Sequence, residues 1–154
     1  MTVTNTAERG TGICTKNNSV ELIDVALKGC TGKALHIPKG HNVLLYRSNT
    51  AVVATRCEFA NSRYGAAVYG SLTSATFKNC VFHDNEYHGI FGSHSTIHLH
   101  GDATSIHSNG TIGIRASNSG KVLLHLPSNH NTSYNNGRED RSTNRGGTIT
   151  NVED

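Results

Sequence analysis

An Asn-x-x-x-Gly unit occurs three times in this chain, with a constant step of 24 residues between copies. The three units begin at Asn61, Asn85 and Asn109. A fixed period of this length predicts that each segment is one structural unit whose apolar face is covered by the next copy. Asparagine side chains bond local backbone in turns, and glycine removes the Cβ where neighbouring backbones crowd. We therefore expect a stack of coils in which the asparagines form a hydrogen-bonded ladder.

The residues between these units favour β-strands. Short runs alternate apolar and polar residues and end at Gly, Ser, Asn or Asp, which is the pattern of half-buried strands. Leucine-rich repeats need several Leu in each copy, and helical repeats need long stripes with a 3.6-residue period, and the sequence has neither pattern. A 24-residue coil holds three short strands and their turns, because a strand rises about 3.3 Å per residue. The clearest runs are 75–82, 96–100 and 121–126.

The stretch 77–90, Phe-Lys-Asn-Cys-Val-Phe-His-Asp-Asn-Glu-Tyr-His-Gly-Ile, resembles the repeats of the right-handed β-helix, pectin-lyase-like superfamily. The resemblance covers about 34–134 and is clearest from Cys57 onward. It implies an all-β fold, a single-stranded, right-handed parallel β-helix of about five to six coils with about 24 residues per coil. The superfamily includes enzymes, adhesins and structural proteins, so the resemblance indicates the fold and leaves the activity open.

The 154 residues predict one domain with three parts. Residues 1–33 are expected to form an N-terminal cap and a first irregular coil. Residues 34–134 are expected to hold the β-helix coils. Residues 135–154, rich in Asn, Gly and charge, are expected to form a polar loop or frayed final coil and then a capping strand at 148–152.

Two segments near the N-terminus need a separate prediction. Residues 19–27 fit either a short helix capped by Ser19 or a strand, and the strand is favoured because strand-length runs follow. One of these later runs is 42–46. Either structure would shield the first coil from edge-to-edge pairing.

Charge and hydropathy exclude several classes of partner. The chain carries 14 Lys and Arg against 11 Asp and Glu, a formal net charge of +3, and its basic residues form no stripe. Nucleic acid is therefore not expected as a partner. No apolar run is long enough for insertion into a membrane. The first residues lack the charged and then apolar pattern of a secretory signal, so the sequence leaves the localisation open, with extracellular and virion-surface sites among the candidates.

The four cysteines have spacings that fit no zinc-binding Cys-x-x-Cys pattern. Cys57 and Cys80 each lie two residues before a Phe, one coil apart, so we expect them to point inward in the same column. Buried thiols are the favoured interpretation, and at least one disulfide is the alternative. The other two cysteines are Cys14 and Cys30.

Ten histidines are unusual for a chain of this size. His98 and His100 alternate with aliphatic residues, so both imidazoles should point outward from the coil. His125 should point outward on the neighbouring strand. Three such imidazoles could ligate zinc, copper or nickel, whereas the alternative is a solvated polar face. The sequence predicts no cofactor beyond this candidate site.

A search for catalytic motifs of the superfamily finds no complete set. The acids in the regular coils include no Asp-Asp pair, Gly-His-Gly and Arg-x-Lys are absent, and the Asp-Pro-His signature is absent too. No catalytic residue can therefore be carried over from the resemblance. A further candidate site is a cluster of acids and histidines at 83–88, for which a solvated turn is the alternative. The acids in the regular coils are Glu58, Asp84, Glu86 and Asp102.

Aromatic and basic residues recur in register over three coils. Ala67, Phe91 and Arg115 fall in one column, and Tyr64 and His88 fall in another. A strip of this kind can stack on sugar faces and hydrogen-bond hydroxyl groups, while packing of the rings against one another is the alternative. The candidate ligand-binding residues are Arg63, Tyr64, Tyr69, Tyr87, His88, Phe91 and Arg115.

The sequence thus favours a non-catalytic β-helix module that binds or displays an extended carbohydrate at a surface. One alternative is a domain related to polysaccharide lyases, hydrolases or epimerases. The other is a purely structural fibre or spike module. A β-helix has two open ends and flat faces, so a homo-oligomer formed through end or face contacts is also compatible with the sequence.

Overall fold

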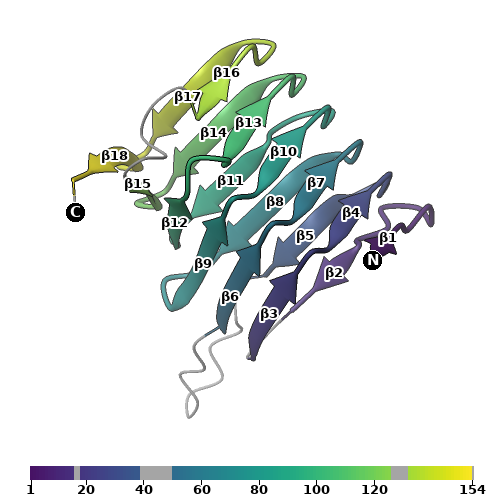
Figure 1. The fold of residues 1–154 in the computed structure, drawn as a ribbon. Helices are drawn as coiled ribbons and strands as arrows, with labels where there is room; N and C mark the ends of the chain where they lie inside the picture. Colours follow the sequence, from purple (N-terminus) through teal and green to yellow (C-terminus); the bar gives the residue numbers. More distant parts are fainter. Residues whose placement is uncertain (16–17, 39–49, 126–131, 154) are drawn as a thin grey trace.

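A computed structural model describes residues 1–15, 18–38, 50–125 and 132–153 of the chain (Figure 1). Within these ranges all of the regular secondary structure is β-strand, numbered β1 to β18. The described residues therefore include no helix that is long and apolar enough to cross a membrane. The strand predicted at 42–46 lies outside the described residues.

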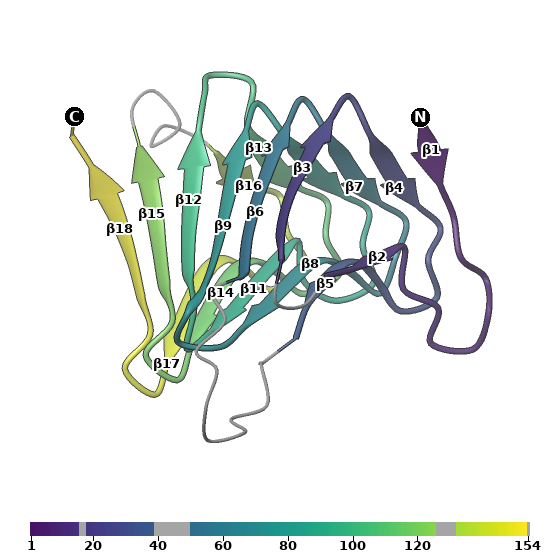
Figure 2. The same ribbon diagram turned by 90° about the horizontal axis from the view of Figure 1, so that it is seen from below.

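The strands wind into a solenoid of about 6 turns, built from three parallel sheets (Figures 1 and 2). Consecutive strands lie in different sheets, and every third strand returns to the same sheet. The three sheets enclose the core like the sides of a prism, which Figure 2 shows from below. The predicted all-β fold with parallel coils of about 24 residues is confirmed.

Within the described residues, each sheet, named A, B or C here, contains six strands. Sheet A consists of β1 (Thr2–Val3), β4 (Ala26–Lys28), β7 (Glu58–Ala60), β10 (Val81–His83), β13 (Ser105–His107) and β16 (Ser133–Tyr134). Sheet B consists of β2 (Ile13–Cys14), β5 (Lys33–Ile37), β8 (Tyr64–Tyr69), β11 (Ile90–Ser93), β14 (Ile112–Ser117) and β17 (Glu139–Asn144). Sheet C consists of β3 (Ser19–Ile23), β6 (Thr50–Thr55), β9 (Thr73–Lys78), β12 (Thr96–His100), β15 (Lys121–His125) and β18 (Thr148–Val152).

The two ends of the chain join the same sheets as the middle. The segment predicted as a strand or a helix forms β3 and the start of β4, two strands separated by the corner at Asp24, so strand structure and not a helix forms there. At the other end, β17 lies where a polar loop or frayed final coil was expected. This strand is mostly exposed, yet it pairs in parallel with β14 along its length. Backbone hydrogen bonds to the preceding coil therefore suffice to extend a segment without apolar alternation.

The core is a continuous column of inward side chains. On β12, Ile97 and Leu99 are fully buried, while the residues that alternate with them face outward. Phe59 and Phe82, from successive coils, stack with ring centroids 4.6 Å apart. Stacking of equivalent residues along the axis is how one coil covers the apolar face of the next.

The cysteines are free thiols. Cys30, Cys57 and Cys80 are buried, as predicted, and burial raises the pKa of the Cys80 thiol to about 12. The N–H of Val81, next to Cys80, bonds to the Cys57 carbonyl, so these two thiols occupy equivalent positions in adjacent coils. Cys14 is exposed and differs from that prediction. The three buried cysteines thus act as small apolar residues of the core.

The glycines of the Asn-x-x-x-Gly units lie where neighbouring coils approach closely. A Cβ on Gly65 would lie 2.5 Å from the Gly89 carbonyl oxygen, and one on Gly89 would lie 2.9 Å from the Gly113 carbonyl oxygen. Both distances are shorter than a carbon–oxygen contact allows, so the predicted crowding at these positions is confirmed.

Each corner of the solenoid carries residues with left-handed backbone in successive coils. Such a residue turns the chain sharply, and Gly, Asn and Asp adopt this conformation most readily. Between sheets A and B, these residues are Gly29, Asn61, Asp84, Ser108 and Asn135. Between sheets B and C, they are Gly70, His94, Asn118 and Arg145. Between sheets C and A, they are Asp24, Arg56, Asn79 and Gly101.

Candidate functional site

The outer face of sheet B carries the aromatic and basic residues singled out in the sequence. Strand pairing sets Phe91 of β11 beside Ala67 of β8 and Arg115 of β14. Tyr64 and His88 lie side by side, with ring centroids 5.4 Å apart. The columns expected from the repeat period are therefore the columns of the structure.

The rings on this face form one connected set. His88 contacts Phe91 at 5.9 Å between ring centroids, and Phe91 contacts Tyr69 at 5.4 Å. Tyr64 stacks on Tyr87 at 5.5 Å. Ala67, between His36 and Phe91 in its column, is fully buried. The rings thus pack partly on one another and also present a shared apolar surface.

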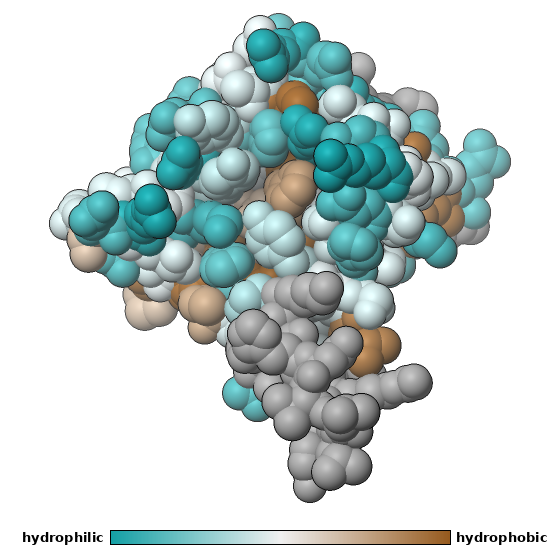
Figure 3. Space-filling view, turned by 180° about the vertical axis from the view of Figure 1, so that it is seen from behind, coloured by the Kyte–Doolittle hydropathy of each residue, from teal (hydrophilic) through white to brown (hydrophobic). Residues whose placement is uncertain are grey.

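A shallow groove of about 390 Å³ runs beside these rings and ends at the corner between sheets B and C. Figure 3 shows the molecule from behind, the side of sheet B, where apolar atoms lie among hydrophilic ones. Four of the seven predicted ligand residues lie along the groove, and four further polar residues complete it. The lining residues are Tyr64, His88, Phe91, Arg115, Ser117, Asn118, Asn144 and Arg145.

His88 is held in one orientation by Thr111. The Thr111 hydroxyl donates to the Tyr87 carbonyl at 2.8 Å and lies 2.7 Å from His88 Nδ1. A hydroxyl has one proton, so Nδ1 of His88 must be the donor in the second bond, and Nε2 is left as an acceptor. Burial, and then the charge of Arg115, lowers the pKa of His88 to about 4. His88 is therefore neutral at pH 7 and offers a hydrogen-bond acceptor.

The other predicted ligand residues lie outside the groove lining. Arg63 lies over the ring of Tyr87, 4.9 Å from its centroid, and donates to the Tyr87 hydroxyl at 3.4 Å. Tyr69 contacts His36 and Phe91, and burial raises the pKa of its hydroxyl. These three residues support the aromatic set from its edges, because each already contacts another member or neighbour of it.

Asn144 contributes an unusual polar atom to the groove. Among the residues that the structure describes, its Oδ1 is the one buried side-chain nitrogen or oxygen without a hydrogen-bond partner. Asn144 lies at the end of β17, in register with Ser117 of β14. A buried acceptor without a donor costs about 1–3 kcal/mol, so it needs an explanation. A ligand that donates a hydrogen bond there would supply one.

The histidines predicted on sheet C also come together. The side chains of His98, His100 and His125 each offer a nitrogen, and these nitrogens all lie within 4.8 Å of one another. His98 Nδ1 lies 2.9 Å from His125 Nε2, and the rings of His100 and His125 stack at 4.0 Å. All three side chains are half-buried. Burial, and then His125, lowers the pKa of His98.

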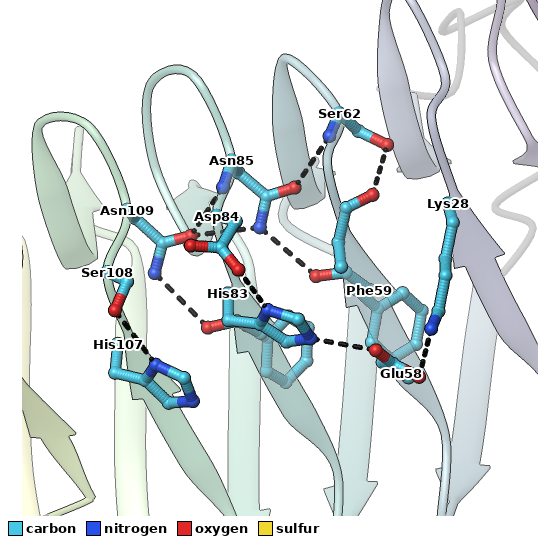
Figure 4. Close-up of polar contacts among 12 residues, drawn as sticks. Lys28, Glu58, Phe59, Ser62, His83, Asp84, Asn85, His107, Ser108 and Asn109 are labelled. Carbon is cyan, nitrogen blue, oxygen red and sulfur yellow. Dashed lines mark hydrogen bonds and ion pairs between the residues drawn. The ribbon is translucent and has the colours of Figure 1, made fainter.

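A buried file of side-chain hydrogen bonds runs along the corner between sheets A and B (Figure 4). Asn85 Nδ2 donates to Asn109 Oδ1 at 2.9 Å, and Asn109 Nδ2 donates to Asn136 Oδ1 at the same distance. In the preceding coil this place belongs to Ser62, whose N–H donates to Asn85 Oδ1. Asn61, expected in the file, instead occupies the exposed left-handed position one residue earlier, because the adjoining turn is one residue shorter.

An ionic network lies outside this file on sheet A (Figure 4). His83 Nε2 bonds Glu58 Oε1 at 2.8 Å and its Nδ1 bonds Asp84 at 2.6 Å, while Lys28 pairs with Glu58 at 2.7 Å. Burial opposes protonation of His83, but the two carboxylates raise its pKa above the usual value. The cluster considered at 83–88 is therefore divided, because His83 bonds these acids on sheet A and His88 faces the groove on sheet B.

Comparison with known families agrees with this architecture. A family model described as right handed beta helix region matches residues 11–153. The chain belongs to the right-handed β-helix family. The comparisons with curated proteins and with solved structures gave no match. Membership of this family sets the handedness of the coils, as predicted, and leaves the ligand of the β-helix to be argued from its own residues.

Sequence reasoning missed the far wall of the groove in this β-helix. Asn118 and Arg145 lie at equivalent left-handed corner positions, and Asn144 lies one residue before the second of them. The repeat period alone does not align Asn118 with Arg145, because the spacing between these two coils is longer than the period. The signal that was available is the Ser-Asn pair at 117–118, which follows the predicted column of Arg115.

Proposed function

We propose that the groove on sheet B binds an extended carbohydrate and that this β-helix module has no catalytic machinery of its own there. The observation that carries the proposal is the juxtaposition of a connected aromatic surface with polar groups left open to a ligand. Sugars present apolar C–H faces that stack on rings, and hydroxyl groups that need donors and acceptors.

The floor and the wall of the groove divide these tasks. Tyr64 and Phe91 provide ring surface, and His88 provides an acceptor at Nε2. The wall provides amides at Asn118 and Asn144, including the unpartnered Oδ1 of Asn144. Binding would then satisfy a polar group that the protein leaves unsatisfied.

The charge of the groove favours an acidic sugar. Among the described residues, its lining includes Arg115 and Arg145 and no Asp or Glu. In the described part of the chain, Arg115 forms no ion pair with an acidic side chain. A guanidinium group matches a carboxylate in a bidentate pair, so a uronate-containing polysaccharide fits this lining better than a neutral one.

The same lining argues against hydrolysis at this groove. Most glycoside hydrolases place two carboxyl groups across the scissile bond, about 5–10 Å apart. The part of the groove that the structure describes offers no carboxyl group, and the acids of sheet A are paired with Lys28 and His83. Binding without turnover is therefore the activity that these residues support.

The test is a glycan array of the purified chain that includes polyuronates and neutral plant, algal and bacterial polysaccharides. We expect retention on polyuronates, weakened at least about tenfold by Arg115→Ala, which removes an interaction of about 1.4 kcal/mol. Arg56→Ala is the matched control, since it deletes the same charge at the corner between sheets C and A, where Arg56 pairs with Asp24, and should bind normally. No binding by a chain with an intact circular dichroism spectrum would overturn the proposal, and release of shortened sugars would replace it with an enzyme.

A further inference from the structure

Three histidines on the outer face of sheet C form a compact group that takes no part in the lining of the proposed carbohydrate groove. Strand pairing sets His98 beside Leu123, and Leu99 beside Leu124, so that His100 and His125 follow at adjacent places on β12 and β15. The inward residues of both strands are buried in the core, which fixes the backbone beneath the histidines. Their Cα positions are therefore set by the solenoid and not by a mobile loop.

We propose that His98, His100 and His125 bind a divalent transition metal, with Zn²⁺ as the reference ion. The nitrogens that they offer lie within 4.8 Å of one another. Zinc bonds imidazole nitrogen at about 2.0–2.1 Å, so two ligands of a tetrahedral ion lie about 3.3 Å apart. Side-chain rotation alone can close the difference, since all three histidines are half-buried and project from rigid strands.

The contact between His98 and His125 is the feature that a metal would change most. Two imidazole nitrogens 2.9 Å apart can share one proton, with one ring as donor and the other as acceptor. A metal ion takes the place of that proton and bonds both nitrogens. The ring of His100 stacks 4.0 Å from the ring of His125 and must tilt out of this stack to bring its nitrogen to the same ion.

The surroundings define which ion fits and how tightly. Imidazole-only sites suit zinc, copper and nickel and discriminate against magnesium and calcium, which need oxygen ligands. Lys78 pairs with His100 across β9 and β12, and its charge opposes a bound cation. Thr76 and Val152 are the neighbouring residues on the flanking strands, beside His98 and His125 respectively. Three protein ligands leave one tetrahedral position for water.

The experiment is a titration of the untagged, metal-free chain with Zn²⁺ alone, followed by isothermal calorimetry. We expect one equivalent of zinc to bind, and His98→Ala to weaken that binding at least about tenfold. His107→Ala is the matched control, because His107 lies on sheet A in a stack with His83 and Tyr134. Lys78→Gln should tighten the binding by removing the opposing charge.

A second measurement guards against variants that fold poorly. Co²⁺ in place of Zn²⁺ gives visible absorption bands whose intensity reports tetrahedral coordination, and Ca²⁺ should give no heat. Absence of zinc binding by the parent chain overturns the proposal, as does equal loss in His98→Ala and His107→Ala. Zinc binding that persists when Arg115→Ala has lost carbohydrate confirms that the two sites are independent.

Discussion

Two regions of this β-helix treat a buried asparagine amide in opposite ways. At the corner between sheets A and B, the amide of Asn85 accepts from Ser62 N–H and donates to Asn109 and to the Phe59 carbonyl. At the groove wall, Asn144 keeps a buried oxygen without a partner among the described residues. The same kind of side chain is thus fully hydrogen-bonded within the protein in one region and lacks a partner for its oxygen in the other.

The difference separates stability from binding. A polar group that is fully bonded inside the protein stabilises the fold and has nothing to offer a ligand. A group that is left unbonded costs stability and is worth keeping only where something else completes it. The same kind of substitution should therefore have different effects at the hydrogen-bonded corner and at the groove wall.

The largest effect is expected at the corner. Asn85→Ala leaves the Ser62 N–H and the Phe59 carbonyl without their partner, both in the buried file. We expect the free energy of unfolding to fall by about 2–4 kcal/mol in urea denaturation, because each buried group left unpaired costs about 1–3 kcal/mol. The control is Asn61→Ala at the exposed corner position, which should cost only about 1 kcal/mol, from the left-handed backbone alone. Equal losses of unfolding free energy in the two variants would mean that the buried file of hydrogen bonds does not stabilise the fold.

The next effect depends on pH and concerns His88. The pKa of His88 is about 4 in the folded protein against 6.5 for an ordinary histidine, so the unfolded chain binds the extra proton first. Stability is therefore full above pH 6.5 and declines as the pH falls toward 4, by about 2 kcal/mol for this residue. His88→Gln should flatten this decline in unfolding curves measured from pH 7 to pH 4.5. A slope unchanged by the substitution would show that other groups cause it.

The comparison is sharpened by a substitution at the groove wall. Asn144→Ala removes an unsatisfied oxygen, so the free energy of unfolding should stay the same or rise by up to about 1 kcal/mol. Binding of a uronate polymer should weaken by about threefold to tenfold, since the amide no longer meets the sugar. Loss of stability together with unchanged binding would place Asn144 with the structural amides instead.

The smallest effect is expected in the ionic network of sheet A. Two carboxylates raise the pKa of His83 above 6.5, so its stabilising effect is full below pH 6.5 and is lost as the pH rises through the raised value. His83→Gln should therefore cost about 0.5–1 kcal/mol at pH 6 and less at pH 8.5, the opposite direction to His88. Unfolding curves of both variants at the two pH values make the comparison, and a cost that grows with pH would contradict the assignment.

Much of the fold followed from the repeat period, and the reason is physical. Residues one coil apart stack, so a period near 24 fixes which side chains become neighbours, as it did for Phe91 and Arg115. Alternation within a strand then fixes which side faces out, as it did for His98 and His100. Both rules depend only on strand geometry, which does not vary from coil to coil.

The turns were harder to predict because their length varies. The step from Phe59 to Phe82 is 23 residues and that from Gly65 to Gly89 is 24, so a fixed period placed Asn61 one position from its true column. Asn136 was missed because it follows Asn109 after 27 residues. The far wall of the groove lies at such a turn. The strip of aromatic residues was therefore visible in the sequence, and the cavity beside it was not.

The polar coil that contains β17 links ligand binding to local stability. Strand β17 is mostly exposed, so the final coil contributes little apolar burial, and its backbone amides should exchange with solvent by local opening before those of the inner coils. Asn144 and Arg145, which line the groove, belong to this coil and the turn that follows it. Local opening of this coil would thus remove one wall of the groove, so binding of a sugar and opening of the coil exclude one another. A saturating ligand at about 100 times its Kd would slow hydrogen exchange across β17 by up to about 100-fold, so exchange in this polar coil would report how much of the groove is occupied.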